Sequence, residues 1–192
     1  MADRPQRDAL PDLVAGCLRN HRQSQELLYR QFYGFAMSVC MRYAPTRDSA
    51  LEVLNDGFLK VFTRLDQYDS SQSFKSWLRR IMINTAIDQY RQETRHGQQS
   101  DIERAEQLAP SAEPDAYTQL AHEDLLTLVQ QLSPAYRLVF NLYAIDGYAH
   151  DEIADKLGIS VGSSKSNLAR ARENLRNLLK QHHPDEYARV TR

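Results

Sequence analysis

The sequence predicts an all-α protein of two small helical domains joined by a flexible acidic linker. Over most of the 192 residues, apolar side chains recur every three or four positions, which is the period of an amphipathic helix. Only 7 glycines and 7 prolines are present, and several long segments contain neither, which favours helices over a turn-rich sheet. A central acidic segment lacks the apolar period and divides the helical pattern into two parts.

The N-terminal domain, expected over residues 8–92, begins with three helices. A weak leading helix covers about residues 10–18. Ser24 is placed to cap the second helix, because a serine side chain can accept a hydrogen bond from the first turn. Pro45 ends that helix, and Thr46 is placed to cap the third. The two apolar stripes consist of Leu28, Phe32, Phe35 and Val39, and of Leu51, Leu54, Phe58, Val61 and Leu65.

A polar loop at residues 67–72 leads to a longer helix, expected from about residue 73 to about residue 92. The composition then changes: residues 93–124 hold eight acidic and two basic side chains, with one glycine and two prolines. Such a segment has too few bulky apolar groups to form a core of its own. We therefore expect a flexible linker at residues 93–119.

The C-terminal domain is expected over residues 120–181. Its first helix carries an apolar stripe that ends at Leu132. Ser133 followed by Pro134 predicts the start of a second helix, because serine suits the cap position and proline the first helical position. This helix is expected to stop at Asp146 and Gly147.

The last two helices of this domain are expected to form a helix-turn-helix. A short helix at about residues 150–157 precedes Gly158, which suits a left-handed terminal residue, and Ser160, which can cap the next helix. From Lys156 to Lys180 there are six basic residues and one acidic residue. Basic side chains neutralise phosphates, and small polar ones allow close approach to base edges. The second helix is therefore predicted to bind double-stranded DNA.

One motif in this turn suggests a different class of protein. Residues 158–162 match the G-x-S-x-G nucleophile elbow of hydrolases. That motif requires a strand before the serine, whereas a helix is predicted here. The serine is better explained as a helix cap.

Composition and charge exclude several broad classes. The net charge of −1 means that any affinity for nucleic acid must come from local clusters of basic residues. The polar N-terminus is unlike a signal peptide, and no apolar run is long enough for a membrane helix. Cys17 and Cys40 have no partners at metal-ligand spacing and are expected to be small buried residues. We expect a cytoplasmic protein without a metal, a cofactor or membrane insertion.

Two sets of motifs resemble the sigma-70 family of RNA polymerase sigma factors, and more narrowly its extracytoplasmic function (ECF) group. Residues 132–175, which include Leu-Ser-Pro-Ala-Tyr-Arg and Leu-Gly-Ile-Ser-Val-Gly-Ser-Ser-Lys-Ser, resemble region 4. Residues 50–62 resemble region 2.2, and residues 73–91 resemble regions 2.3 and 2.4. The two resemblances occur in the family's order and are separated by a linker.

The resemblance implies a transcription initiation factor that has no catalytic activity and directs core RNA polymerase to promoters. The implied partners are the β′ clamp and β flap of the polymerase, promoter DNA and an anti-sigma factor. In the family, the region 2.2 helix docks on the β′ clamp. The corresponding face here offers Glu52, Asn55, Asp56 and Leu59, and its alternative interpretation is an ordinary solvated helix face. Asn55 and Asp56 are shorter than the usual Gln and Glu.

The family's −10 reader matches the polar loop and the long helix. There, a base is flipped out of the stack as the strands open, and the protein must return contacts that offset the lost stacking. Asn84 is a candidate for contacting that base, and Trp77 either stacks on it or belongs to the core. Asp88 is expected to be a structural or surface carboxylate. The matching residues are Tyr68, Asp69, Ser70, Ser73, Lys75, Trp77, Arg79, Arg80, Asn84 and Arg91.

The family's −35 reader matches the start of the last helix. Lys165, Ser166, Ala169 and Arg170 correspond to its reading residues, and Ser163 and Arg172 are expected to contact phosphates. Ser164 stands where valine is usual, on the semi-buried side. Asn167 replaces a usual basic residue, which should weaken nonspecific binding.

Two other functions remain open from the sequence. A helix-turn-helix regulator that acts without polymerase would explain residues 133–180 but not the region 2-like helices. A helical anti-sigma or adaptor protein that binds only proteins would make Lys165 and Arg170 dispensable. No carboxylate pair, metal cluster or phosphate loop in the sequence supports an enzyme.

Overall fold

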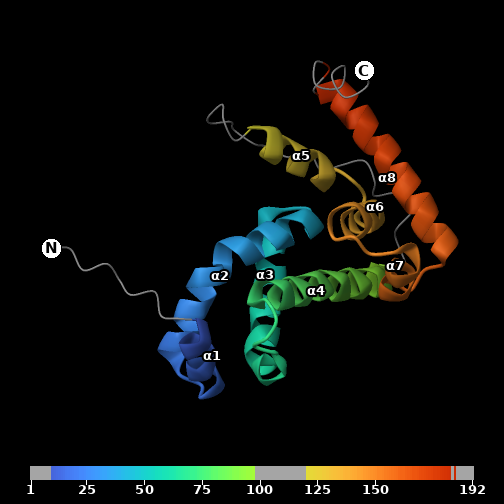
Figure 1. Cartoon of the computed structure of the whole chain (residues 1–192). Helices are drawn as coiled ribbons and strands as arrows, with labels where there is room; N and C mark the ends of the chain where they lie inside the picture. Colours follow the sequence, from blue (N-terminus) through green and yellow to red (C-terminus); the bar gives the residue numbers. More distant parts are fainter. Residues whose placement is uncertain (1–9, 98–119, 183, 185–192) are drawn as a thin grey trace.

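The computed structural model describes residues 10–97, 120–182 and 184, and it contains only helices and connecting segments in these ranges (Figure 1). The predicted all-α class is confirmed. The first part of the chain forms α1 (Leu10–Leu18), α2 (Arg22–Tyr43), α3 (Arg47–Thr63), a 3₁₀ turn (Leu65–Gln67) and α4 (Phe74–Gly97). The second part forms α5 (Leu120–Gln130), α6 (Pro134–Phe140), a π-helical turn (Asn141–Ile145), α7 (His150–Leu157) and α8 (Val161–His182).

The N-terminal half is built on the mutual packing of α2, α3 and α4. Their apolar stripes meet in a core whose fully buried members include Leu28, Leu54 and Leu78. Gly57 lies where α3 crosses α4, and a Cβ atom at this position would overlap the side chain of Met82. A larger residue at position 57 would therefore have to displace the end of the buried Met82 side chain.

Local signals placed one helix start correctly and another incorrectly. The Thr46 hydroxyl accepts a hydrogen bond from Ser49 N at 3.2 Å, so it caps α3 as expected. The prediction that Ser24 caps α2 was wrong. His21 occupies the cap position, and the Ser24 hydroxyl lies inside the first turn, 3.0 Å from His21 Nδ1.

The long helix α4 extends farther than the sequence suggested. It was expected to end near residue 92 but continues to Gly97. No residue before Gly97 breaks a helix, and the Thr94 hydroxyl donates to Tyr90 O at 2.8 Å, within the helix. The first five residues of the expected linker are therefore helical, and residues 98–119 of it lie outside the described ranges.

In the C-terminal half, α6 and α7 pack on α8. Leu138, Leu142, Ile153 and Leu168 are buried between them. Pro134 begins α6 as predicted, although the Ser133 side chain makes no capping hydrogen bond. None of the helices that the structure describes is both long and apolar enough to cross a bilayer.

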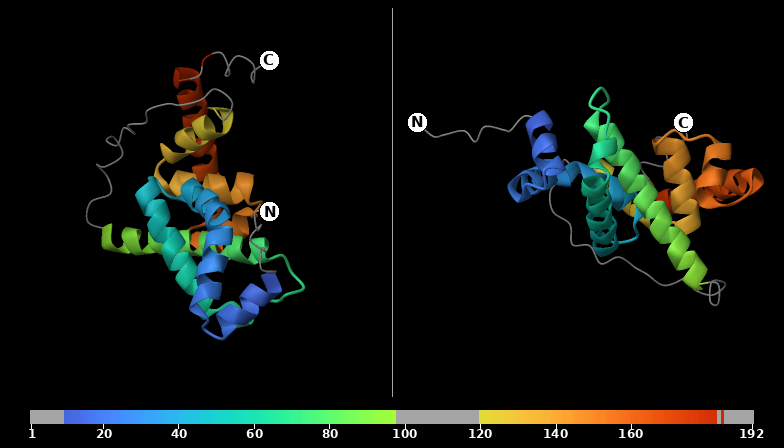
Figure 2. Two further views of the ribbon diagram at one scale, coloured as in Figure 1. Left: turned by 90° about the vertical axis from the view of Figure 1, so that its left-hand side faces the viewer. Right: turned by 90° about the horizontal axis from the view of Figure 1, so that it is seen from below.

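The two halves lie against each other (Figures 1 and 2). Helix α4 contacts α7, and the C-terminal end of α2 lies beside α5 and α6. Buried apolar residues form one continuous cluster that extends from Leu13 in α1 to Leu168 in α8. Side chains of both halves thus share a core.

Candidate nucleic-acid interface

The predicted helix-turn-helix is formed by α7 and α8. Gly158 ends α7 in the left-handed conformation, with φ of +67°, and the following N–H, that of Ile159, donates to Ala154 O at 3.1 Å. Ser160 Oγ then accepts a hydrogen bond from Ser163 N at 3.0 Å and caps α8. A Schellman-type end followed by a serine cap makes a tight turn, and it sets the direction of α8.

The start of α8 presents a basic and otherwise small surface to solvent. Leu168 and Ala171 are buried against the rest of the domain. The residues matched to the −35 reader lie on the exposed sides of the helix: Ser163, Lys165, Ser166, Ala169, Arg170 and Arg172. A helix with exposed cations and small neighbours can enter a major groove.

Ser164 is fully buried, and its hydroxyl shares a hydrogen bond of 2.9 Å with His150 Nδ1. The sequence predicted the semi-buried position but not the partner, which comes from α7. The bond explains how a polar residue is accommodated where the family usually has valine, because buried hydroxyl groups need a partner.

Three aromatic or imidazole side chains that the sequence did not single out support the exposed cations. Tyr136 OH accepts a hydrogen bond from Arg170 Nη1 at 3.3 Å. The Arg172 guanidinium lies 5.7 Å from the centre of the Tyr143 ring, and that ring stacks on His150 at 4.6 Å. In the two arginine–tyrosine pairs the partners are about 30 residues apart in the sequence, so local spacing carries no signal of them.

The loop matched to the −10 reader is built around aromatic packing. The rings of Tyr68, Phe74 and Trp77 lie 5.1–5.6 Å apart, with Phe74 buried and the other two half-buried. Asp69 accepts hydrogen bonds from Ser71 N at 2.9 Å and from Gln72 Nε2 at 3.2 Å. Hydrogen bonds from Ser71 and Gln72 lower the pKa of Asp69, which keeps its carboxylate ionised as the acceptor that shapes the loop.

The remaining residues of this set fall into two groups. Ser70, Ser73, Lys75 and Arg80 are exposed. The other three side chains contact the C-terminal half. Arg79 Nε lies 3.0 Å from Asp146 Oδ1, Asn84 Oδ1 accepts from Lys156 Nζ at 3.3 Å, and Arg91 Nη2 donates to Asp155 O at 3.3 Å. The structure therefore does not bring the whole set together on one open surface.

The face of α3 matched to the polymerase-binding region is exposed at all four residues, Glu52, Asn55, Asp56 and Leu59, and the Leu59 residue is 64% exposed. These residues line an open groove between α3 and α4. Asp88 pairs with Lys60 at 2.9 Å across the same groove, in agreement with its expected structural role.

Neither thiol in the described ranges belongs to this interface. Cys17 and Cys40 are buried and unpaired, and burial raises the pKa of Cys40 to about 12. A thiol with so high a pKa is a poor nucleophile and a poor ligand. Among residues 10–97 and 120–182, no group of three His, Cys, Asp or Glu side chains is arranged to hold a metal ion.

Comparison with known proteins agrees with this arrangement. Residues 28–96 match the family model of sigma-70 region 2, and residues 122–175 match that of sigma-70 region 4. Together the two matched segments cover more than half of the chain.

Two curated relatives are ECF factors. The ECF RNA polymerase sigma factor SigE of Mycolicibacterium smegmatis is 27% identical over 164 residues, which cover 84% of this chain and 60% of that protein. The ECF RNA polymerase sigma-E factor of Escherichia coli (strain K12) is 25% identical over 175 residues, which cover 86% of this chain and 91% of that protein.

A solved structure shares the fold. It is the sigma factor RpoE in complex with the anti-sigma factor NepR from Bartonella quintana, with a TM-score of 0.52 and 23% identity over 82% of this chain and 98% of that chain. The two family models match in order along one helical chain, and the curated relatives are ECF factors. The protein therefore belongs to the sigma-70 family of promoter-directing transcription initiation factors, in its ECF group.

Proposed function

We propose that this chain binds core RNA polymerase and directs it to promoters by reading two separate DNA elements. The observation that carries the proposal is the exposed, basic start of α8, which stands apart from the acidic and polar face of α3. One surface suits DNA and the other suits a protein. A regulator that binds only DNA, or an adaptor that binds only protein, would need only one of these two surfaces.

The −35 element is read by α8 in the major groove. Arg170 and Lys165 are suited to guanine edges or phosphates, while Ser166 and Ala169 let the helix approach the bases. Ser163 and Arg172, at the sides of the same helix, contact phosphates and fix its register.

The −10 element is read by the loop at residues 68–73 and by α4. The ring cluster of Tyr68 and Trp77 forms one wall for a flipped base, and the half-exposed Trp77 can stack on it. Lys75 and Arg80 are exposed and suited to the backbone phosphates of the opened strand. Asn84 supplies an amide for hydrogen bonds to a base edge.

Core polymerase docks on α3. An exposed leucine surrounded by polar side chains has the composition of an interface centre with a polar rim, and Leu59 with Glu52, Asn55 and Asp56 fits that description. We assign this face to the β′ clamp.

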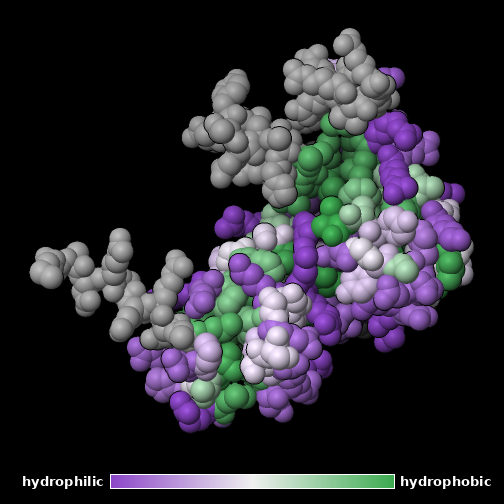
Figure 3. Space-filling model, viewed as in Figure 1, coloured by the Kyte–Doolittle hydropathy of each residue, from purple (hydrophilic) through white to green (hydrophobic). Residues whose placement is uncertain are grey.

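A second protein-binding surface lies on the C-terminal half, where apolar surface extends between α5 and α8 (Figure 3). Leu125 of α5 is 55% exposed. We assign this surface to the β flap of the polymerase and, in the inactive state, to an anti-sigma factor. The chain has no catalytic activity of its own in this role, and it acts in the cytoplasm with the polymerase and DNA.

Run-off transcription with purified core polymerase tests the proposal, on promoters selected from a random DNA library by the assembled holoenzyme. Wild-type chain should yield promoter-dependent transcripts. The double variant Lys165→Ala/Arg170→Ala should give a promoter-dependent transcript yield that is lower by about tenfold or more, because each good base contact contributes about 1–3 kcal/mol. The matched control, Arg176→Ala/Lys180→Ala, removes the same charge from the exposed far end of α8 and should retain most activity.

Each rival predicts a different result. A DNA-binding regulator gives no promoter-dependent transcript with any selected fragment. An adaptor leaves promoter recognition unchanged when Lys165 and Arg170 are both replaced.

A further inference from the structure

Two tyrosines that precede the helix-turn-helix in the chain reach its recognition helix, α8. Tyr136 lies in α6, and Tyr143 lies in the π-helical turn that follows α6. Tyr136 OH accepts a hydrogen bond from Arg170 Nη1 at 3.3 Å. The Arg172 guanidinium lies 5.7 Å from the centre of the Tyr143 ring. Each contact joins one exposed arginine of α8 to one tyrosine outside that helix.

The two arginines project from different sides of α8. Ala171, the residue between them, is fully buried. Successive side chains of an α-helix point about 100° apart, so Arg170 and Arg172 flank the buried stripe that passes through Ala171. Each arginine therefore meets a different part of the segment formed by α6 and the π-helical turn.

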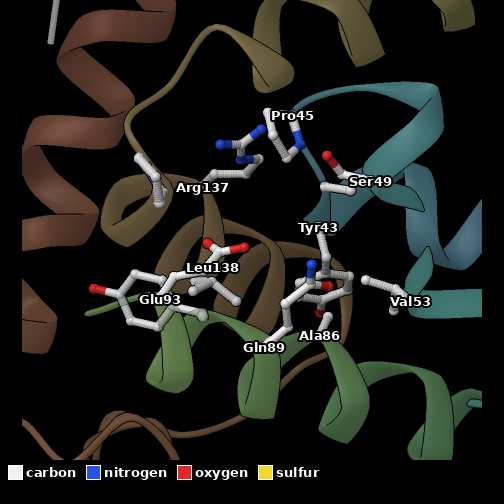
Figure 4. A pocket seen from close by; sticks show the side chains of 12 residues that line it. Tyr43, Pro45, Ser49, Val53, Ala86, Gln89, Glu93, Arg137 and Leu138 are labelled. Carbon is white, nitrogen blue, oxygen red and sulfur yellow. The ribbon is translucent and has the colours of Figure 1, made fainter. Parts of the chain in front are cut away.

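Helix α6 directs neighbouring side chains to different partners. Arg137 and Leu138, together with Tyr43 of α2, line a cavity of about 60 Å³ at the border with the N-terminal half (Figure 4). Tyr136, by contrast, is half-buried and reaches α8. Since α6 also packs on α8, Tyr136 offers Arg170 an acceptor whose position is set by the helix.

The contact between Tyr136 and Arg170 depends on the tyrosine hydroxyl group. A guanidinium carries five N–H donors in one plane, and this bond uses a donor on Nη1. Guanine recognition requires two donors of the same plane to meet O6 and N7 together. An arginine that is already held at one nitrogen loses less conformational freedom when it binds, so a fixed plane favours guanine over other bases.

The contact between Tyr143 and Arg172 depends on the aromatic ring instead. A cation within about 6 Å of a ring centre is attracted by the ring face and keeps its N–H donors for other partners. The ring itself stacks on His150 at 4.6 Å, and His150 Nδ1 shares a hydrogen bond of 2.9 Å with the buried Ser164. Such a contact places the charge without fixing the plane, which suits a phosphate, because phosphate contacts carry no direct sequence information.

From these contacts we propose that the two tyrosines position the two arginines for different tasks: Tyr136 orients Arg170 to read a guanine of the −35 element, and Tyr143 holds Arg172 against the DNA backbone. The proposal rests on the function assigned above for α8. Both tyrosines are positioning residues, since each acts through an arginine. Base preference at one position of the promoter then depends on a hydroxyl group of another helix.

Promoter selection by the full chain bound to core polymerase tests the role of Tyr136. The holoenzyme selects fragments from a random DNA library, and sequencing gives the base preference at each −35 position. Arg170→Ala identifies the position that Arg170 reads. Tyr136→Phe should lower the guanine preference at that position by about fivefold, the effect of one lost hydrogen bond, and leave the other positions unchanged. Tyr143→Phe is the matched control, because it also removes a tyrosine hydroxyl but keeps the ring, and it should select like wild type.

Salt-dependent binding of the same holoenzyme to one selected promoter tests the role of Tyr143. Tyr143→Leu removes the ring and should weaken binding by about threefold at every sequence, with a salt dependence that is lower by about one phosphate contact. Arg172→Ala should have the same two effects. Because the tyrosine acts through the arginine, Tyr143→Leu should add little to the loss in the Arg172→Ala background. Circular dichroism establishes that each variant keeps its helix content.

Each part of the inference has an outcome that excludes it. An unchanged guanine preference in Tyr136→Phe would overturn the role of Tyr136. A loss from Tyr143→Leu that persists in full when Arg172 is already alanine would overturn the role of Tyr143. In both cases the wild-type holoenzyme still selects a −35 sequence, so the proposed function stands. A wild-type holoenzyme that selects no −35 sequence would overturn the proposed function and this inference together.

Discussion

At the scale of single residues, several polar side chains in this chain are held in place by a partner from another helix. Ser164 illustrates the point, because its burial could be anticipated from helical spacing, whereas its bond to His150 could not. Tyr136 and Tyr143 are similar cases, since each supports a cation of α8 from a distant position in the sequence. Residue identity thus predicted which part of α8 faces DNA in our proposal, while tertiary contacts hold the side chains of that surface in place.

Replacing Ser164 by alanine should lower the free energy of unfolding by about 1–2 kcal/mol, because it leaves the His150 ring nitrogen without its bond and opens a small space. Urea unfolding followed by circular dichroism measures the change. Ser76→Ala provides the control, as Ser76 is exposed on α4, and should alter stability very little. Equal losses of unfolding free energy in the two variants would show that the buried hydrogen bond does not add to stability.

At the scale of helices, terminal signals decided how well boundaries could be predicted. The starts of α3 and α8 follow from Thr46 and Ser160, whose hydroxyls bond the first turn. Ser24 has the same chemistry but sits three residues after His21, which takes the cap position instead. The π-helical turn before Asp146 has no recognisable sequence pattern. Its first residue, Asn141, donates to Arg42 O at the end of α2, and Gly147 follows the turn with a φ of +75°.

Two cap residues allow a direct comparison. Thr46→Ala should cost about 1 kcal/mol of stability, since the Ser49 amide loses its acceptor. Ser133→Ala should cost much less, because the Ser133 side chain makes no capping bond at the start of α6. Thermal or urea unfolding of both variants checks the difference. A loss at Ser133 as large as that at Thr46 would contradict the assigned roles.

At the scale of the whole molecule, the sequence predicted two helical domains but not their contact. The pairs Tyr43–Asp146 and Arg42–Asn141 are separated by about a hundred residues, and no spacing rule links positions so far apart. Among the residues matched to the −10 reader, the sequence likewise could not show which ones stay exposed and which ones contact the C-terminal half, because those contacts also join distant positions. The side of α3 that we propose to face polymerase takes no part in these contacts.

Leu59→Asp should weaken binding to core polymerase by about thirtyfold, the equivalent of a hot-spot loss of about 2 kcal/mol, without affecting folding. Leu18→Asp makes the same chemical change at an exposed leucine in α1 and should leave affinity unchanged. Biolayer interferometry with immobilised core polymerase compares the two. Comparable affinities for both variants would remove α3 from the proposed docking surface.

The apolar cluster shared by both halves has a consequence for the lifetime of the protein in a cell. Any separation of the halves would expose side chains such as Val53 and Leu138, which line the same cavity at the border between them. Exposed apolar surface attracts proteases and chaperones, so a chain whose halves have separated is the form most readily degraded.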